Sequence, residues 1–178
     1  MRFLLLAGKG RRAPFRHILA PLVGVGAAFA CGCASAQTRS EWVIVASNAE
    51  AALGIDRHSV TRDGDAATAS ILMGTFGLET FEDGSKVQYY LSREMFRCDV
   101  RTRSELEVRM FGSAADLIGV IPSLEIDRPV RPGSIYNDIL IAACDGETGL
   151  GGRGFIEPRS AIEAERQRRF RDGLPVED

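Results

Sequence analysis

Four cysteines constrain this chain of 178 residues more than any other feature. Cys31 and Cys33 lie at the end of an apolar N-terminal segment, whereas Cys98 and Cys144 lie far apart in the body of the chain. The apolar segment is typical of an export leader, and exported proteins reside where disulfides form and persist. We therefore expect a disulfide between Cys98 and Cys144, with two buried free thiols as the alternative.

The first 36 residues have the order of charge and hydropathy that is typical of a signal peptide. Residues 1–16 contain five basic side chains and no acidic one, and Ile18–Ala30 is apolar. Small residues follow, which predicts cleavage by a signal peptidase between Ala36 and Gln37. The alternative is lipidation of Cys33, which would anchor the chain in a membrane. The apolar run is short and is interrupted by glycines, which disfavours a membrane-spanning helix there. We expect no membrane-spanning segment in the mature chain either.

The charge of the mature chain argues against a nucleic-acid partner. Removal of the leader would leave 17 basic and 24 acidic side chains, a net charge near −7. Nucleic-acid binding needs a clustered positive surface, which this balance does not favour. The length predicts one domain over residues 37–146. The glycine-rich and charged residues 147–178 offer few large apolar side chains, so we expect a flexible tail there.

The body of the domain alternates apolar and polar residues with the period of two that is typical of strands. Asp63-Gly64 and Asp83-Gly84 favour tight hairpin turns. The same alternation places Cys98 on an apolar face. Strands are predicted over residues 41–46, 53–56, 66–76, 87–91, 95–102 and 106–110. Short runs joined by tight turns indicate an antiparallel meander.

A short helix is predicted after the proline-rich stretch from Pro122 to Pro132, which disfavours strand and helix alike. Ser134 can cap its first turn, and the apolar side chains up to Cys144 lie on one helical face. A strand over residues 138–144 is the alternative. The predicted fold class is therefore α+β: an antiparallel meander with a short C-terminal helix packed on it and tied by the disulfide.

The residue types that carry catalysis are few and scattered in sequence. His58 is the only histidine of the mature chain, and one histidine with two distant cysteines cannot close a zinc site. Lys86 is the only lysine of the mature chain, with no apolar pocket apparent around it. The glycines of residues 149–154 match a dinucleotide fingerprint in spacing, but they stand in no βαβ repeat. We therefore expect no catalytic residue, no cofactor and no metal.

The residues nevertheless resemble a known family, the surface-adhesin protein E domains of bacterial envelopes. The resemblance covers residues 42–144. It rests on Trp42-Val43, Ile55-Asp56, Ser59-Val60, Asp63-Gly64, Arg97-Cys98, Arg101, Phe111-Gly112 and Pro132-Gly133-Ser134 leading into Cys144. It implies an antiparallel sheet with a disulfide-tied helix, a lipid-anchored adhesin that holds host matrix proteins, and a capacity to form a homodimer. The chain departs from the family in its added tail after Cys144.

Two functions follow as expectations. The first is a non-enzymatic module, exported to the periplasm or the outer envelope surface, that binds an envelope or extracellular protein or peptidoglycan through sheet edges and loops. The second is an exported small-molecule-binding protein or hydrolase with an acidic site around His58, Glu79 and Asp83. Convergence of these three side chains in one concave pocket would favour the second.

Overall fold

The computed structural model describes residues 39–122, 126–145 and 152–176. The chain divides between Ala36 and Gln37 into two units, and all the described residues belong to the second. The predicted cleavage site and Cys33 lie outside the described residues, so the cleavage and lipidation hypotheses stay predictions. Residues 149–151 of the glycine-rich stretch 149–154 lie outside them as well.

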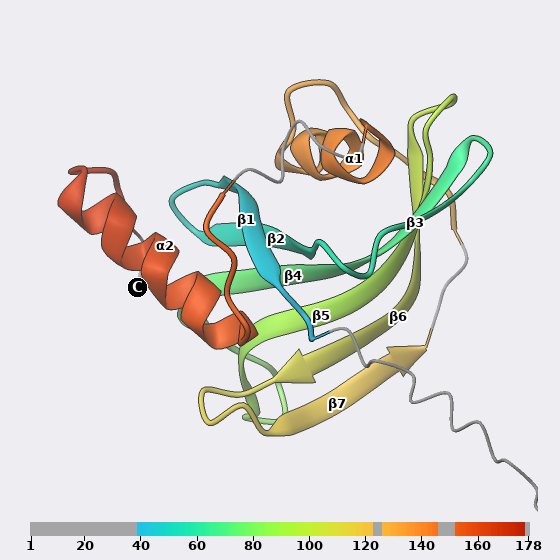
Figure 1. Cartoon of the computed structure of the whole chain (residues 1–178). Helices are drawn as coiled ribbons and strands as arrows, with labels where there is room; N and C mark the ends of the chain where they lie inside the picture. Colours follow the sequence, from blue (N-terminus) through green and yellow to red (C-terminus); the bar gives the residue numbers. More distant parts are fainter. Residues whose placement is uncertain (1–38, 123–125, 146–151, 177–178) are drawn as a thin grey trace, which may run out of the picture. The chain divides into compact units, whose positions relative to one another are not determined.

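The domain is built on one antiparallel sheet (Figure 1). Its main strands lie in the order β1 (Trp42–Ser47), β2 (Ala51–Asp56), β4 (Ala66–Thr80), β5 (Lys86–Arg97), β6 (Thr102–Phe111) and β7 (Leu117–Pro122). Short strands β3 (Thr61–Asp63) and β8 (Arg128–Pro129) pair with β4 and β6. Gly64 and Gly84 take the positive φ angles, 58° and 82°, that the predicted hairpin turns require. The antiparallel meander is therefore confirmed.

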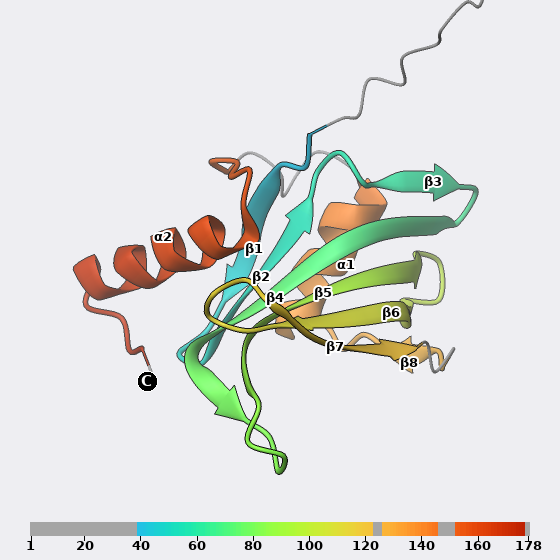
Figure 2. The same ribbon diagram turned by 90° about the horizontal axis from the view of Figure 1, so that it is seen from below.

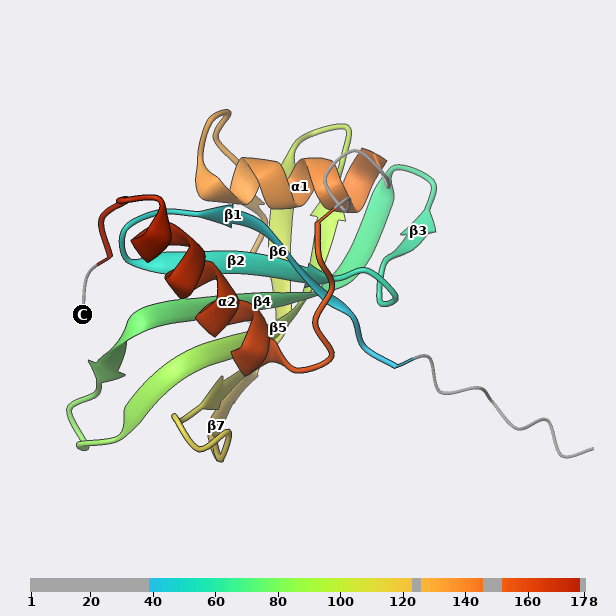
Figure 3. The same ribbon diagram turned by 60° about the vertical axis from the view of Figure 1, so that its left-hand side comes forward.

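Two helices pack on opposite faces of this sheet. Helix α1 (Ile135–Asp145) lies behind the strands in Figure 2, and helix α2 (Pro158–Arg171) crosses in front of β2, β4 and β5 in Figure 3. The sequence of β2 shows the same division, because its successive side chains point to opposite faces. Leu53 joins the core beneath α1, whereas Ala52 joins the core beneath α2.

The core beneath α1 is the one that the sequence predicts. Ile139 and Ala143 of the helix are fully buried against Ile71 and Phe96 of the sheet. The disulfide between Cys98 and Cys144 joins the end of β5 to the end of α1 and is confirmed. The predicted helix over residues 135–144 is likewise confirmed, with an end at Asp145.

The second core contains α2 and corrects the expectation of a flexible tail. Ala161 and Ile162 of this helix are buried, and Ile162 lies directly over Gly74 of β4. Before the helix, Phe155 forms a bridge with Trp42 of β1. These contacts, together with the hydrogen bond from the Ser47 hydroxyl of β1 to Glu165 at 2.6 Å, hold a helix whose exposed side chains are mostly polar or charged. Sequence reasoning failed here because an Ile gains a docking site only where a glycine on another strand leaves room for it.

Two further differences concern strand ends. β5 ends at Arg97 rather than at residue 102, and the chain turns through Arg101, whose φ is 53°. Val100 in this turn is 53% exposed, although the alternation of apolar and polar residues placed it inside the predicted strand. The alternation continues through the turn, so it does not show where the chain reverses direction. Strand β8 lies inside the stretch where prolines were expected to exclude strands. It is tolerated because it has only two residues and its Pro129 pairs at the margin of the sheet.

Candidate functional site

The β7 edge is the most exposed apolar feature of the sheet. We define it by three side chains: Leu117 is 55% exposed, Val120 50% and Ile121 42%. No residue of β7 carries a charge, and β6 is its only neighbour among the described strands. Natural proteins commonly protect such edges with charged residues or cover them with another segment, and exposed apolar patches mark interaction sites. The β7 edge is therefore the candidate binding site.

The opposite edge of the sheet is treated differently. The amide of Trp42 in β1 donates to the carbonyl of Phe155 at 2.7 Å, and the amide of Phe155 donates to the carbonyl of Trp42 at 2.8 Å. The guanidinium of Arg57 donates to the carbonyl of Gly152 at 3.0 Å, which holds the same segment. The chain thus covers part of the β1 edge with its own backbone, whereas the described residues place no such cover on β7.

Apolar side chains continue from the β7 edge across the neighbouring strands. The register places Met73 of β4, Tyr90 of β5 and Met110 of β6 in one row that ends at Gly119 of β7. The first three are half-buried, and a Cβ at Gly119 would lie 2.8 Å from the Cε of Met110. A single methionine therefore covers the glycine. The row extends the β7 edge into an apolar strip on the α1 side of the sheet.

Tyr90, between Met73 and Met110, carries the polar side-chain group of this row. Its hydroxyl donates a short hydrogen bond to the carboxylate of Glu79, near the tip of the β4–β5 hairpin. Burial, and then the bond and charge of Glu79, raise the pKa of Tyr90. The tyrosine therefore stays neutral at physiological pH and adds a fixed, largely apolar ring to the strip.

A buried charge cluster lies between the sheet and the start of α1, and sequence reasoning missed it. Glu94 is 1% exposed, and its carboxylate accepts from the Arg103 guanidinium at 3.0 Å and from the Ser92 hydroxyl at 2.8 Å. Arg103 also donates to Glu105 at 2.9 Å, and its guanidinium stacks 3.7 Å from the ring centre of Tyr136. Glu94 and Arg103 meet because a register shift in the β5–β6 pair lies next to them.

The electrostatics of this cluster fit a structural role. Burial raises the pKa of Glu94, against the charge of Arg103, which lowers it. Burial also raises the pKa of Tyr136 to about 12. Each buried polar atom has a partner, and removal of one partner would leave an uncompensated charge. The cluster therefore fixes the first turn of α1 on β5 and β6.

The acidic site proposed from sequence does not assemble. His58 lies in the turn after β2, with its Nε2 3.2 Å from the carboxylate of Glu41. Its neighbour Ser59 accepts a hydrogen bond from Ser70 in β4, whereas Glu79 lies nine residues further along that strand. Their partners on β5, Arg93 and Val87, are six residues apart, which at the rise of a strand is roughly 20 Å. Asp83 accepts a bond from the Ser85 hydroxyl at 2.6 Å within its own turn. The three side chains therefore do not converge.

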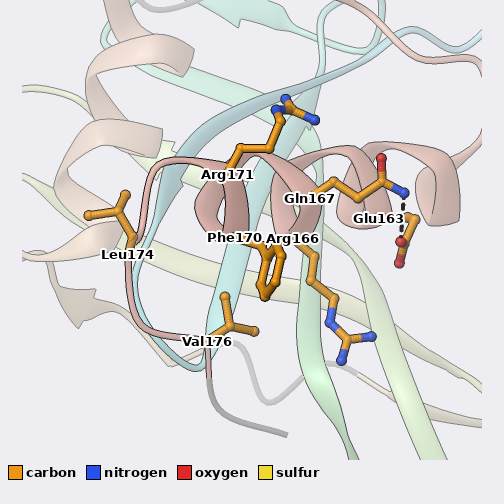
Figure 4. Close-up of a pocket in the computed structure, with 7 residues that line it drawn as sticks. All are labelled: Glu163, Arg166, Gln167, Phe170, Arg171, Leu174 and Val176. Atoms are coloured by element: carbon orange, nitrogen blue, oxygen red, sulfur yellow. Dashed lines mark hydrogen bonds between the residues drawn. The ribbon is translucent and has the colours of Figure 1, made fainter.

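A surface hollow of about 550 Å³ lies at the C-terminal end of α2 (Figure 4). Phe170, which is 82% exposed, faces Val176 across it, and Leu174 lies on its other side. Its polar groups are already paired in part, since Gln167 donates to Glu163 at 2.9 Å. It contains no nucleophile with an adjacent base, so it does not supply the missing catalytic group.

Among residues 39–122, 126–145 and 152–176 no three potential metal ligands come together. Neither helix in the described part of the chain is long and apolar enough to cross a membrane.

Comparison with known proteins gives matches only among solved structures. No family model matches the chain, and no curated protein does. A structure of Haemophilus influenzae protein E is 12% identical, with 62% of this chain and 89% of that chain covered and a TM-score of 0.43. A structure of protein E from non-typeable Haemophilus influenzae is 11% identical, with coverage of 75% and 92% and a TM-score of 0.40. Protein E is the name of the family that the sequence resembles. At these scores the likeness assigns no binding residue.

Proposed function

We propose that this chain is an exported, non-enzymatic module of the bacterial envelope that binds a protein partner through the β7 edge. The observation that carries the proposal is the contrast between the two sheet edges. The chain covers Trp42 of β1 with Phe155, but β7 presents three exposed apolar side chains and no charge. Exposed apolar area that is kept on a folded domain favours burial against a partner.

The chemistry of the β7 edge favours a protein over peptidoglycan. A glycan strand presents hydroxyl and amide groups, which need polar side chains to replace their bonds to water. Leu117, Val120 and Ile121 offer none. The row that ends at the neighbouring Gly119, which contains Met73 and Met110, is largely apolar as well. A homodimer through the same edge would bury the same side chains and is a separate outcome of the test.

The enzyme alternative loses its proposed site in this structure, because His58, Glu79 and Asp83 are held in separate turns and strands. His58 is engaged with Glu41, and Asp83 with Ser85. The hollow at the end of α2 and three others among the described residues are lined by no histidine, cysteine or lysine, so none of the four places a serine beside a histidine base. The non-enzymatic function is therefore the simpler proposal.

The test is capture of envelope proteins with the mature chain, residues 37–178, and with matched variants. Val120→Lys places a charge on the β7 edge, and Val100→Lys places the same charge in the turn after β5. The two valines are 50% and 53% exposed, so both changes should leave stability within about 0.5 kcal/mol of the wild type. We expect Val120→Lys to lose the captured protein and Val100→Lys to retain it.

The same experiment can contradict the proposal. Equal capture by the wild type and Val120→Lys would show that the β7 edge is not the binding site. Equal loss in both lysine variants would indicate general charge repulsion. Loss of a concentration-dependent dimer in Val120→Lys, with no captured protein, would assign the edge to a second copy of the chain. His58→Ala should retain capture, and a hydrolytic activity that disappears in this folded variant would support the enzyme alternative.

A further inference from the structure

Resting on the proposed function, we infer that the β7 edge binds its partner by strand addition, and that the partner supplies an extended, uncharged segment rich in apolar residues. The backbone of β7 determines the mode of binding, and its side chains determine the chemistry of the ligand.

The backbone of β7 requires an extended partner. In a strand, the amide and carbonyl groups point alternately to either side, and β6 pairs with one side of β7 through residues Leu117–Pro122. The groups on the other side repeat at the spacing of a strand. A helix or a lipid surface cannot match a row of alternating donors and acceptors, whereas another strand matches it along its whole length.

The molecule contains an example of this pairing at its other edge. Phe155 approaches β1 antiparallel to Trp42, and the two residues exchange both of their backbone hydrogen bonds at 2.7 and 2.8 Å. Trp42 is 4% exposed, because its side chain belongs to the core beneath α2. The β1 edge thus already accepts an extended segment, and the apolar side chains of β7 are more exposed than Trp42 and Val43 of β1.

The side chains of β7 specify an uncharged ligand. Ile121 pairs with Val108 on the face that carries Met110, and Val120 pairs with Arg109 on the other face. The guanidinium of Arg109 donates to Glu107 at 2.6 Å, so the nearest charge on that face already has a partner. A charged side chain in the ligand would lie beside aliphatic groups and lose hydration without compensation. Apolar and hydroxyl side chains fit both faces.

The test uses a defined probe: a capped peptide of eight alternating valine and threonine residues, with a lysine at each end for solubility. At saturating peptide, the outward amides of residues 117–121 should exchange their hydrogens at least about tenfold more slowly, as expected when an exposed amide joins a ladder. Amides of the turn at Val100 should not change. A control peptide with proline at alternate positions cannot form the ladder and should give no protection.

Proline in the protein separates strand addition from side-chain docking. Gly119 and Val120 are adjacent, so the amide of one points to β6 and the amide of the other points outward. Proline at the outward position leaves the β6 ladder intact, because edge strands tolerate it there. Of Gly119→Pro and Val120→Pro, the variant that keeps the wild-type melting transition should bind the peptide about tenfold more weakly.

Each outcome decides the inference. Slowed exchange with the peptide, together with its loss in the folded proline variant, supports strand addition. If capture of the envelope protein disappears in Val120→Lys but persists in the folded proline variant, binding uses side chains alone, and strand addition is wrong although the proposed function stands. Slow exchange in β7 that depends on protein concentration without peptide would overturn the inference in favour of a second copy.

Discussion

The docking of α2 gives a prediction that can be worked out from single atoms. Ile162 is 3% exposed, and a Cβ built at Gly74 would lie 2.2 Å from its Cγ1, 2.4 Å from its Cδ1 and 3.0 Å from its Cγ2. Gly74→Ala therefore forces an added methyl into the isoleucine. Ile162→Ala removes all three of the atoms that this methyl would meet. The two substitutions should compensate each other.

The expected magnitudes follow from packing. Gly74→Ala overpacks the core and should cost about 1–3 kcal/mol of unfolding free energy. Ile162→Ala opens a cavity beside Trp42 and Leu72 and should cost about 2–5 kcal/mol. In the double variant the new methyl occupies part of that cavity without a clash. Its cost should be smaller than the sum of the single costs by at least about 1 kcal/mol.

Urea unfolding followed by tryptophan fluorescence measures all four proteins of the cycle. Trp42 is the only tryptophan of the chain and belongs to the same core, so it reports on this region directly. Ile156→Ala is the matched control, because Ile156 is 55% exposed and its truncation should change stability by less than about 0.5 kcal/mol. Additive effects of Gly74→Ala and Ile162→Ala would refute the contact between α2 and β4. A negligible effect of Ile162→Ala would restore the interpretation of residues 158–171 as a loose tail.

Three further predictions concern the disulfide, pH and the leader. Cys98→Ala opens a loop with a sequence separation of 46 and should cost about 4 kcal/mol in the same urea assay, and an unchanged midpoint would show that the bridge does not limit the unfolded chain. The hydrogen bond from Arg168, and then that from Ser47, lower the pKa of Glu165 below its ordinary 4.5, so its stabilisation is present above that value and lost as pH falls through the lowered pKa. The stability difference between wild type and Glu165→Gln should accordingly shrink on acidification, and a constant difference would contradict this linkage. The intact mass of the exported protein should correspond to a chain that begins at Gln37, whereas a diacylated chain that begins at Cys33 would establish the lipoprotein alternative.

Local patterns in the sequence were sufficient to predict the sheet and α1. Alternation in β4, β5 and β6 and the two Asp-Gly turns depend on neighbouring residues, so they can be read without knowledge of the fold. The disulfide could be predicted as well, because Cys98 and Cys144 are the two body cysteines of a chain whose first residues have the pattern of an export leader. Register shifts and the reversal at Arg101 could not, since a period of two continues unchanged through a tight turn.

The candidate site was predictable in kind but not in place. An antiparallel meander must have two edges, which is why a sheet edge could be named as the binding surface from sequence. Which edge stays open depends on distant residues. Phe155 covers part of β1 in the segment that leads into α2, and α2 docks where Gly74 leaves space for Ile162.

The separation of the catalytic candidates and the buried charges was likewise decided by tertiary structure. His58 and Glu79 belong to turns and strands whose spacing is set by the register of β2 on β4. Glu94 and Arg103 are a pair because β6 folds back on β5 with a shift, and α1 then closes over them with Tyr136. The sequence by itself determines the alternation of the strands and the hairpin turns, because these depend on neighbouring residues. It also determines the cysteine pair, because the body of the chain offers no other cysteines. Contacts between distant residues depend on register and on space left by other side chains, and these exist only in the folded chain.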